Sequence, residues 1–189
     1  MLVPDLPLRT ERLLLRPFTA DDLDALTAYR SRPDVTRFLY HDPYDDAAAR
    51  AALERLRGRT ALREPGDVLN LAITRPETGE LVGDVLLTWS SAEHRQGEIG
   101  YVLHPEHVGR GYVTEASREM LRLGFDGLGL HRIVGRLDAR NAASARVLER
   151  LGMRREAHLR ENEFVKGEWT DELVYALLAR EWRAGTADS

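Results

Sequence analysis

The sequence predicts a single mixed α/β (α+β) domain, in which an antiparallel meander of strands precedes a strand–helix–strand unit. The chain has 189 residues, the usual size of one domain. Three short apolar runs separated by turn residues lie between residues 68 and 103. A glycine-containing turn then leads into an amphipathic stretch and a further apolar run. No repeat or linker divides residues 1–189, and the folded core is expected between about residues 8 and 180.

The first quarter of the chain is expected to hold one strand and two helices. Residues 10–17 are apolar in the middle and end at a proline, which is typical of a short strand. Thr19 precedes two aspartates, as at a helix N-terminus, so we expect a helix over residues 20–31 that ends before Pro33. The elements expected next are a helical turn at 34–38, a loop at 40–46 and a helix at 46–59.

The remaining strands and helices follow from the same patterns. The meander has strands at 68–74, 81–89 and 97–103, with a tight turn around Gly79 and a polar loop at 90–96. The elements expected after it are a helix at 112–124, a strand at 131–138, a helix at 141–151 ended by Gly152, a hairpin of strands 153–165 and 168–178 that turns at Lys166-Gly167, and a frayed tail at 184–189. The sequence thus predicts about seven strands and about four helices.

The composition excludes several classes of protein. There is no cysteine, so no disulfide framework, cysteine zinc site or cysteine nucleophile is available. The formal net charge of −4 argues against a broad nucleic-acid-binding surface. Residues 1–7 lack the basic and apolar regions of a signal peptide, and no apolar run reaches 18 residues. We therefore expect a cytoplasmic protein with no direct nucleic-acid or membrane partner and no metal.

A glycine turn at residues 108–113 is the first candidate binding site. Gly109 and Gly111 allow close approach of the backbone to a ligand, and the unpaired N–H groups of the following helix favour an anion. The pattern lacks the Lys-Ser/Thr of a phosphate-binding P-loop and the third glycine of a dinucleotide fingerprint. Taken alone, the turn is explained equally well by glycines that only serve a tight strand-to-helix connection.

Several motifs together resemble one family. Glu98-Ile-Gly-Tyr101 and Gly109-Arg-Gly-Tyr-Val-Thr-Glu-Ala116 are similar to the acyl-CoA signature of the GNAT N-acetyltransferases, RimJ/RimL branch. The other segments that resemble this branch are residues 10–18, 141–144, 148–153, 159–167 and 171–175. The resemblance covers the chain from about residue 8 to 178.

The resemblance implies a fold, a reaction and a set of site residues. The fold is a mixed sheet whose fourth and fifth strands splay apart to admit coenzyme A. The reaction transfers acetyl from acetyl-CoA to a primary amine, and the branch favours the α-amine of a ribosomal-protein N-terminus. Whether the protein forms a homodimer is left open. The residues implied in coenzyme binding are Tyr101, Val102, Leu103, Val108, Gly109, Arg110, Gly111, Tyr112, Val113, Thr114, Asn141 and Ser144.

Two positions depart from the family pattern. Val108 stands where the family has glutamine or arginine, and Val113 stands where it has glycine or alanine. Backbone amides around Gly111 do not depend on these side chains, so we expect pyrophosphate binding to survive. Val113 is expected to crowd the start of the helix slightly, which puts coenzyme affinity in question.

The candidate bases are two glutamates. An ammonium acceptor must lose a proton before it attacks, and a carboxylate can take that proton directly or through water. Glu98 shares a strand face with Gly100 and Val102, so we expect burial to raise its pKa. The alternative for Glu98 is a solvent-facing or arginine-paired acid. Glu163, on the terminal hairpin, is the second candidate as base or ammonium anchor, and its alternative is an exposed surface acid.

Four further roles are assigned from the resemblance. Ser144 is placed near the thioester sulfur as a hydrogen-bond donor to the leaving thiolate, and Asn141 is placed on the pantetheine amides. Both also suit a helix start, with Asn141 as N-cap. A backbone N–H at Val102 or Leu103 is expected to meet the developing oxyanion. Gly100 and Gly135 are expected to ease close approach of the coenzyme.

Alternative functions remain open at this point. The acceptor could be a small amine or an antibiotic instead of a protein N-terminus. The same scaffold could serve a non-catalytic acyl-CoA-binding regulator, or the turn could belong to a nucleotide- or phosphate-binding protein. Because there is no cysteine, any acyl transfer must be direct, in a ternary complex, and not through a thioester on the protein.

Overall fold

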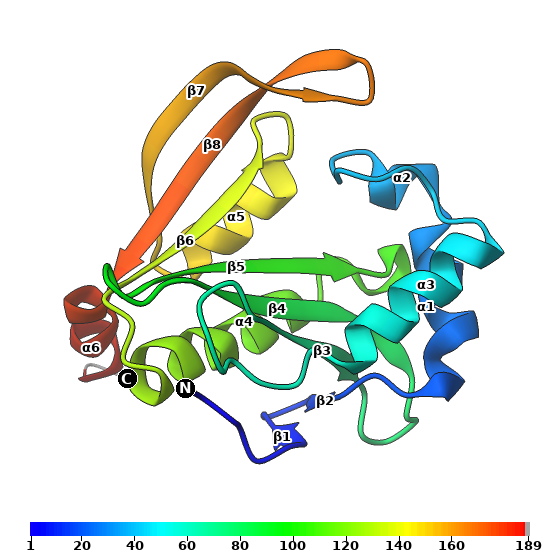
Figure 1. Ribbon diagram of the computed structural model, residues 1–189, viewed down its shortest axis with the longest axis horizontal. Coiled ribbons are helices and arrows are strands. Elements are labelled where there is room, and N and C mark those ends of the chain that lie inside the picture. Colours follow the sequence, from blue (N-terminus) through cyan, green and yellow to red (C-terminus); the bar gives the residue numbers. More distant parts are fainter. Residues whose placement is uncertain (188–189) are drawn as a thin grey trace.

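An eight-stranded sheet forms the centre of the molecule (Figure 1). The computed structural model describes residues 1–187. The strand order is β1-β2-β3-β4-β5-β6-β8-β7, and all neighbouring strands are antiparallel except β5 and β6. The strands are β1 (Leu8–Arg9), β2 (Leu14–Arg16), β3 (Val68–Thr74), β4 (Leu81–Ser91), β5 (Gln96–Leu103), β6 (Arg132–Asp138), β7 (Arg154–Val165) and β8 (Glu168–Leu178).

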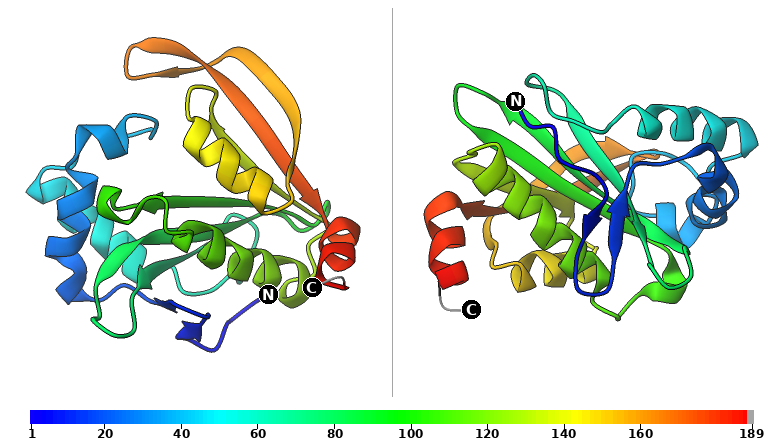
Figure 2. Two further views of the ribbon diagram at one scale, coloured as in Figure 1. Left: turned by 180° about the vertical axis from the view of Figure 1, so that it is seen from behind. Right: turned by 90° about the horizontal axis from the view of Figure 1, so that it is seen from below.

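Six α-helices surround this sheet within the described residues. They are α1 (Leu23–Arg30), α2 (Pro33–Thr36), α3 (Asp46–Arg57), α4 (Tyr112–Arg122), α5 (Ala142–Arg150) and α6 (Ala179–Ala187). Helices α1 and α3 cover one face of β3 and β4, while α4 covers the other face (Figures 1 and 2). None of the helices in residues 1–187 has the length and apolarity needed to cross a bilayer.

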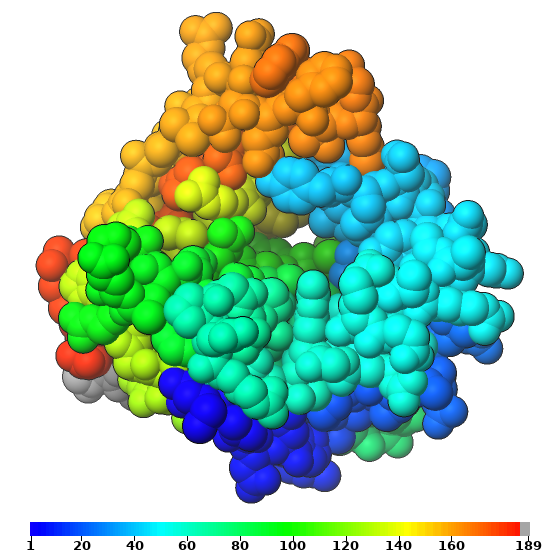
Figure 3. All heavy atoms as spheres, in the orientation of Figure 1, coloured from blue at the N-terminus to red at the C-terminus, as the bar shows by residue number. Residues whose placement is uncertain are grey.

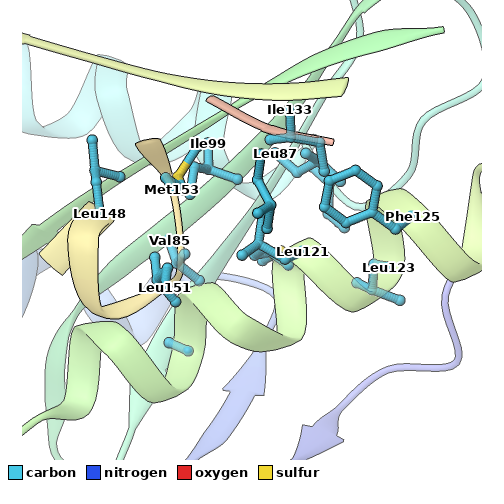
Figure 4. Close-up of a cluster of buried hydrophobic side chains, with 14 of the residues drawn as sticks. Val85, Leu87, Ile99, Leu121, Leu123, Phe125, Ile133, Leu148, Leu151 and Met153 are labelled. Carbon is cyan, nitrogen blue, oxygen red and sulfur yellow. The ribbon is translucent and has the colours of Figure 1, made fainter. Parts of the chain in front are cut away.

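Each face of the sheet has its own apolar cluster, because side chains alternate along a strand. On β3, Leu71 and Ile73 point into the larger cluster with α4, and Ala72 between them points into the smaller cluster with α1 and α3. Figure 4 shows Leu121 of α4 and Phe125 beyond it packed beneath the central strands. Helix α4 fits this position because its buried residues recur every three or four positions: Val113, Ala116, Ser117, Met120 and Leu121.

The feature that matters for function is a split in the sheet. Strands β5 and β6 pair in parallel only from Gln96 to Glu98, opposite Arg132 to Val134. Beyond Glu98, β5 continues to Leu103 and β6 continues to Asp138 without pairing to each other. Figure 1 shows the two strands diverging. The predicted fold class and the predicted splay of these two strands are confirmed.

Several expected boundaries are corrected. The expected strand 10–17 is a two-strand hairpin, in which β1 is an additional strand and the N–H of Thr10 bonds to Leu13 O. The helix expected at 20–31 begins with a 3-10 turn at 20–22. Pro33 starts α2, where its missing N–H has no helical partner to lose, so the helical turn covers 33–36 and not 34–38. The helix expected at 112–124 ends at Arg122 and continues as a π-turn to Gly127.

The C-terminal prediction was wrong for the residues that the structure describes. A frayed tail was expected at 184–189, but residues 184–187 belong to α6. Trp182 secures this helix, since its ring stacks on Phe125 with centroids 5.8 Å apart and its indole N–H donates to Asp126. Residues 188 and 189 lie outside the described part of the chain.

Candidate active site

The split between β5 and β6 opens into a cavity of about 370 Å³. Side chains from β5, β6, α5, the β7–β8 hairpin and the segment after α2 line it. Figure 3 shows the hollow between the hairpin and the segment after α2. The expected site residues that the structure brings into this one cavity are Glu98, Tyr101, Val102, Asn141, Ser144 and Glu163. They come from three elements, β5, α5 with its N-cap, and β7, and the splay is what lets them meet.

Glu98 lies at the last paired position of β5, where the split begins. Its carboxylate is 3.6 Å from the Arg136 guanidinium on β6, and both side chains are about 40% exposed (38% and 42%). Burial raises the pKa of Glu98, the Arg136 charge offsets part of that rise, and the carboxylates of Glu172 and Glu163 add to it. The expected direction of the pKa shift is confirmed, and so is the alternative of an arginine partner.

Glu163, on strand β7 of the hairpin, lines the same cavity. The phenol of Tyr40 donates to both of its carboxylate oxygens, at 3.0 and 2.8 Å. Burial, followed by the Glu163 carboxylate, raises the pKa of Tyr40, so the phenol keeps its proton and stays a donor. Lys166 at the tip of the hairpin donates to the Thr36 carbonyl at 2.6 Å. These two contacts tie the hairpin to the segment around α2 and close the top of the cavity.

The start of α5 forms the wall opposite β5. Asn141 caps the helix, as its Oδ1 accepts the Ser144 N–H at 3.1 Å, which confirms its structural role. The Tyr101 hydroxyl on β5 donates to the Ser144 carbonyl at 3.1 Å. Burial raises the pKa of Tyr101, so this bridge across the split stays protonated. Gly135 on β6 was expected to make room for the coenzyme. In the structure it makes room for α5, because a Cβ at this position would lie 2.8 Å from the Leu148 side chain.

The glycine turn lies outside this cavity, beyond the open end of β5. Gly109 and Gly111 both have positive φ, 84° and 81°, and Gly111 is the N-cap of α4. The first turn of α4 therefore offers unpaired N–H donors where the two strands are apart. Val108 is exposed, and Val113 begins the buried stripe of α4, so its side chain points toward the sheet. The residues of the coenzyme set that do not line the cavity are Leu103, Val108, Gly109, Arg110, Gly111, Tyr112, Val113 and Thr114.

Comparison with known proteins identifies the family. A family model described as an acetyltransferase (GNAT) domain matches residues 12–154. The chain belongs to the GNAT acetyltransferase family. It is 33% identical over 175 residues to the uncharacterized N-acetyltransferase p20 of Bacillus licheniformis, and the aligned region covers 93% of this chain and 97% of that protein. It is also 33% identical over 173 residues to the uncharacterized N-acetyltransferase YnaD of Bacillus subtilis (92% and 97% covered).

A solved structure shows the same likeness in three dimensions. A GNAT-family acetyltransferase from Bacillus anthracis matches with a TM-score of 0.83 at 30% identity, covering 93% of this chain and all of that one. The protein is therefore an acetyl-CoA-dependent N-acetyltransferase. Within the described residues, no group of three or more potential ligands is placed to hold a metal.

In this GNAT enzyme the phase of β5 decides which amides face the split. The His104 N–H donates to the Val82 carbonyl at 2.8 Å. Every second residue of an antiparallel strand faces the same neighbour, so the N–H of Val102 also points to β4. The amides of Tyr101 and Leu103 point into the opening, where β6 no longer pairs. Of the two expected oxyanion donors, the strand phase favours Leu103 and adds Tyr101.

Four features of the GNAT site were missed by the sequence reasoning. Asp84 on β4 accepts hydrogen bonds from Tyr29 and Arg30 of α1, and it lines the cavity together with Arg30. Asn70 of β3 also lines the cavity, 2% exposed, and its Oδ1 has no hydrogen-bond partner within the described residues. None of these residues lies in a motif. A polar residue inside an apolar strand run was the only available signal.

The other two missed features are a tether and an ion pair. The Tyr40 hydroxyl donates to Glu163, which lies 123 positions further along the chain. Arg12 lies at the start of α4, where its guanidinium bonds to Glu115 at 2.7 Å and to the Arg110 carbonyl at 3.0 Å. Burial would raise the pKa of Glu115, but hydrogen bonds from Thr10 and Arg12 outweigh it and lower that pKa. Arg12 thus orders the glycine turn.

Proposed function

We propose that this enzyme acetylates the α-amine of a protein N-terminus, as RimJ/RimL-type enzymes do. The observation that carries the proposal is the single cavity at the split, which holds two glutamates, the start of α5 and the free amides of β5. Such an arrangement serves one amine directed at one thioester. Among relatives, the protein named "Putative ribosomal N-acetyltransferase YdaF" of Bacillus subtilis is 35% identical over 104 residues, or 55% of this chain.

The proposed reaction uses the residues already placed. Coenzyme A enters the split with its pyrophosphate at the amides after Gly111, and its thioester supplies the acetyl group. Glu98, directly or through water, accepts the proton of the ammonium, and the freed amine attacks the carbonyl carbon. The N–H of Leu103 stabilises the charge on the carbonyl oxygen. Ser144 donates a hydrogen bond to the departing thiolate, whose ordinary pKa of about 8.5 makes it a moderate leaving group.

Glu163 has a second place in the proposal. Its two oxygens are already engaged by Tyr40, which orients the carboxylate and makes it better suited to anchor an ammonium than to remove its proton. Within the described residues no hydroxyl donates to Glu98, whose partner is the Arg136 guanidinium at 3.6 Å. Its pKa is raised, with burial as the main cause, so it is the better base. This division assigns each glutamate one task.

A small polyamine is the second candidate acceptor. The spermidine N(1)-acetyltransferase of Escherichia coli is 22% identical over 170 residues, or 90% of this chain. The charge of the cavity opposes this acceptor, because seven arginine and lysine side chains line it against five aspartates and glutamates. A polycation would meet repulsion there, whereas a peptide carries one ammonium and neutral amides.

The test is acetylation of matched acceptors by the purified enzyme. A peptide with a free N-terminus, the same peptide with a blocked N-terminus and an internal lysine, and spermidine are incubated with acetyl-CoA. Thiol release gives the rate, and mass spectrometry locates the acetyl group. We expect turnover of the free peptide only, with intersecting initial-rate lines that indicate a ternary complex. Turnover of spermidine without turnover of the peptide would replace the proposal with the polyamine alternative.

A further inference from the structure

The active-site cavity has charged side chains of both signs. The strand order places β3 on one side of β5 and the hairpin strand β7 on the other. Glu98 of β5 and Glu163 of β7 supply carboxylates. Around Glu98 and Glu163 the signs are mixed, because Arg136, Arg140 and Lys166 line the same end. At the β3 end the charged side chains are basic, namely Arg55 of α3 and Arg59 just after it. Arg59 is fixed beside the sheet, since its carbonyl accepts the Asn70 N–H at 2.8 Å.

These two arginines differ in their contacts from the other five basic residues that line the cavity. Arg30, Arg136 and Arg140 each have a carboxylate partner. Arg37 stacks on the Phe38 ring, and Lys166 donates to the Thr36 carbonyl. Within residues 1–187, the guanidinium groups of Arg55 and Arg59 have no ion pair or hydrogen bond. A cation left unpaired on the wall of a substrate cavity is available for an anionic ligand.

A second observation at the same end also indicates a ligand. Asn70 is 2% exposed, lines the cavity next to Arg59, and its Oδ1 has no hydrogen-bond partner among the described residues. A buried acceptor without a donor costs about 1–3 kcal/mol. The amide N–H of a peptide's second residue, two bonds beyond the carbon that bears the α-amine, is a donor of the kind that this oxygen lacks.

We infer that the acceptor is a dipolar molecule, with its amine at the glutamates and an anionic group bound by Arg55 and Arg59. This inference rests on the proposed function in one respect: for a protein N-terminus, the anionic group is an acidic side chain at the second or third position. Such an acceptor pairs each charge with its opposite inside one cavity. A basic side chain at the same position would meet the two arginines and be rejected.

Three peptides that differ at one position test the inference. They carry aspartate, asparagine or lysine at the second residue, and KM and kcat are measured for each with saturating acetyl-CoA. Loss of a charge-assisted contact is expected to raise KM about tenfold from aspartate to asparagine, with a further rise for lysine. The double variant Arg55→Gln with Arg59→Gln is expected to bring the aspartate and asparagine values together.

Two further variants make the test sharper. Arg57→Gln is the matched control, because Arg57 lies between the two arginines but pairs with Glu54 and does not line the cavity. It is expected to keep the preference for aspartate. Arg59→Glu is expected to favour the lysine peptide over the aspartate peptide. Thermal melting of each variant confirms that it is folded.

A second assay distinguishes failure of the arginine site from failure of the proposed peptide acceptor. 3-Aminopropanoate and its amide are assayed as a non-peptide pair. If only small amines react, the peptide proposal fails, while a preference for the carboxylate over the amide still supports the arginine site. Equal use of the aspartate and asparagine peptides by the wild type, or a preference that survives in the double variant, would overturn the inference.

Discussion

Substitution of Asp84 by asparagine is expected to cause a large loss of stability. Asp84 lies on β4 and lines the cavity at the split, and its side chain is 1% exposed. It accepts the Tyr29 hydroxyl at 2.7 Å and Arg30 Nη2 at 2.6 and 2.9 Å. Asparagine keeps the shape of the side chain but removes its charge. The Arg30 guanidinium would then be a nearly buried cation without a counterion.

The size of the effect follows from the burial of this pair. Removing one partner of a buried ion pair typically costs 3–5 kcal/mol. The Arg30 side chain is 11% exposed and reaches the cavity, where water can solvate part of its charge, so the lower end is expected, about 3 kcal/mol. Domains of this size have a total free energy of unfolding of about 5–15 kcal/mol. The variant should therefore lose a large fraction of its stability.

Urea unfolding followed by circular dichroism measures this loss. Asp84→Asn should lower the midpoint with little change in the slope m. Asp34→Asn is the matched control, because Asp34 pairs with Arg32 on the surface at 3.0 Å, and its midpoint should stay at the wild-type value. The double variant Asp84→Leu with Arg30→Met should recover stability relative to Asp84→Asn. An unchanged midpoint for Asp84→Asn, or a double variant no more stable than the single one, would refute the reasoning.

Three further predictions concern catalysis. Glu98→Gln should lower kcat/KM by about 10²–10⁴, while calorimetry should show unchanged acetyl-CoA binding. Burial raises the pKa of Glu98 above its ordinary 4.5, and the base acts in its deprotonated form, so the wild-type rate should fall as the pH drops through that raised pKa. A pH–rate profile whose acid limb lies at or below pH 4.5 would contradict this. Tyr40→Phe removes the donor to Glu163 and should reduce the rate less than Glu163→Gln does; an equal or larger loss would assign Tyr40 a direct role. Gly111→Val places a β-branched residue at a φ of 81° at the start of α4, so it should raise the KM for acetyl-CoA about tenfold. An unchanged KM would show that the turn does not bind the coenzyme.

The fold was predictable wherever local pattern and tertiary packing agree. The meander strands follow from short apolar runs separated by turn residues, and the α4 stripe follows from a period of three to four residues. Gly79, Gly152 and the Lys166-Gly167 turn all have the positive φ that their positions suggested. The pattern did not predict α6, because a short polar helix is held by the contacts of Trp182 with Phe125 and Asp126, more than fifty residues earlier.

The site was predictable only as far as motifs extend. Glu98, Asn141, Ser144 and Glu163 stand in stretches that resemble a family, and the structure places them in one cavity. The choice of Leu103 over Val102 as the oxyanion donor needed the register of β5 against β4, which the sequence of one strand does not reveal. The partner of Glu163 needed the fold, since the hairpin and the segment after α2 meet only in three dimensions.

The two halves of the site depend on one departure from regular structure. If β6 paired with β5 along its whole length, the amides of Tyr101 and Leu103 would be consumed by the ladder, and no cavity would separate Glu98 from Ser144. The split frees these donors on the side where we propose that the coenzyme binds, and it opens the cavity on the side where we propose that the acceptor binds. The contacts that hold it open are local: Leu148 of α5 fills the space above Gly135, and Tyr101 bridges to the Ser144 carbonyl. A substitution that closes the split should therefore impair coenzyme binding and acceptor binding together, whereas changes at the glycine turn or at Arg55 and Arg59 should affect one of them alone.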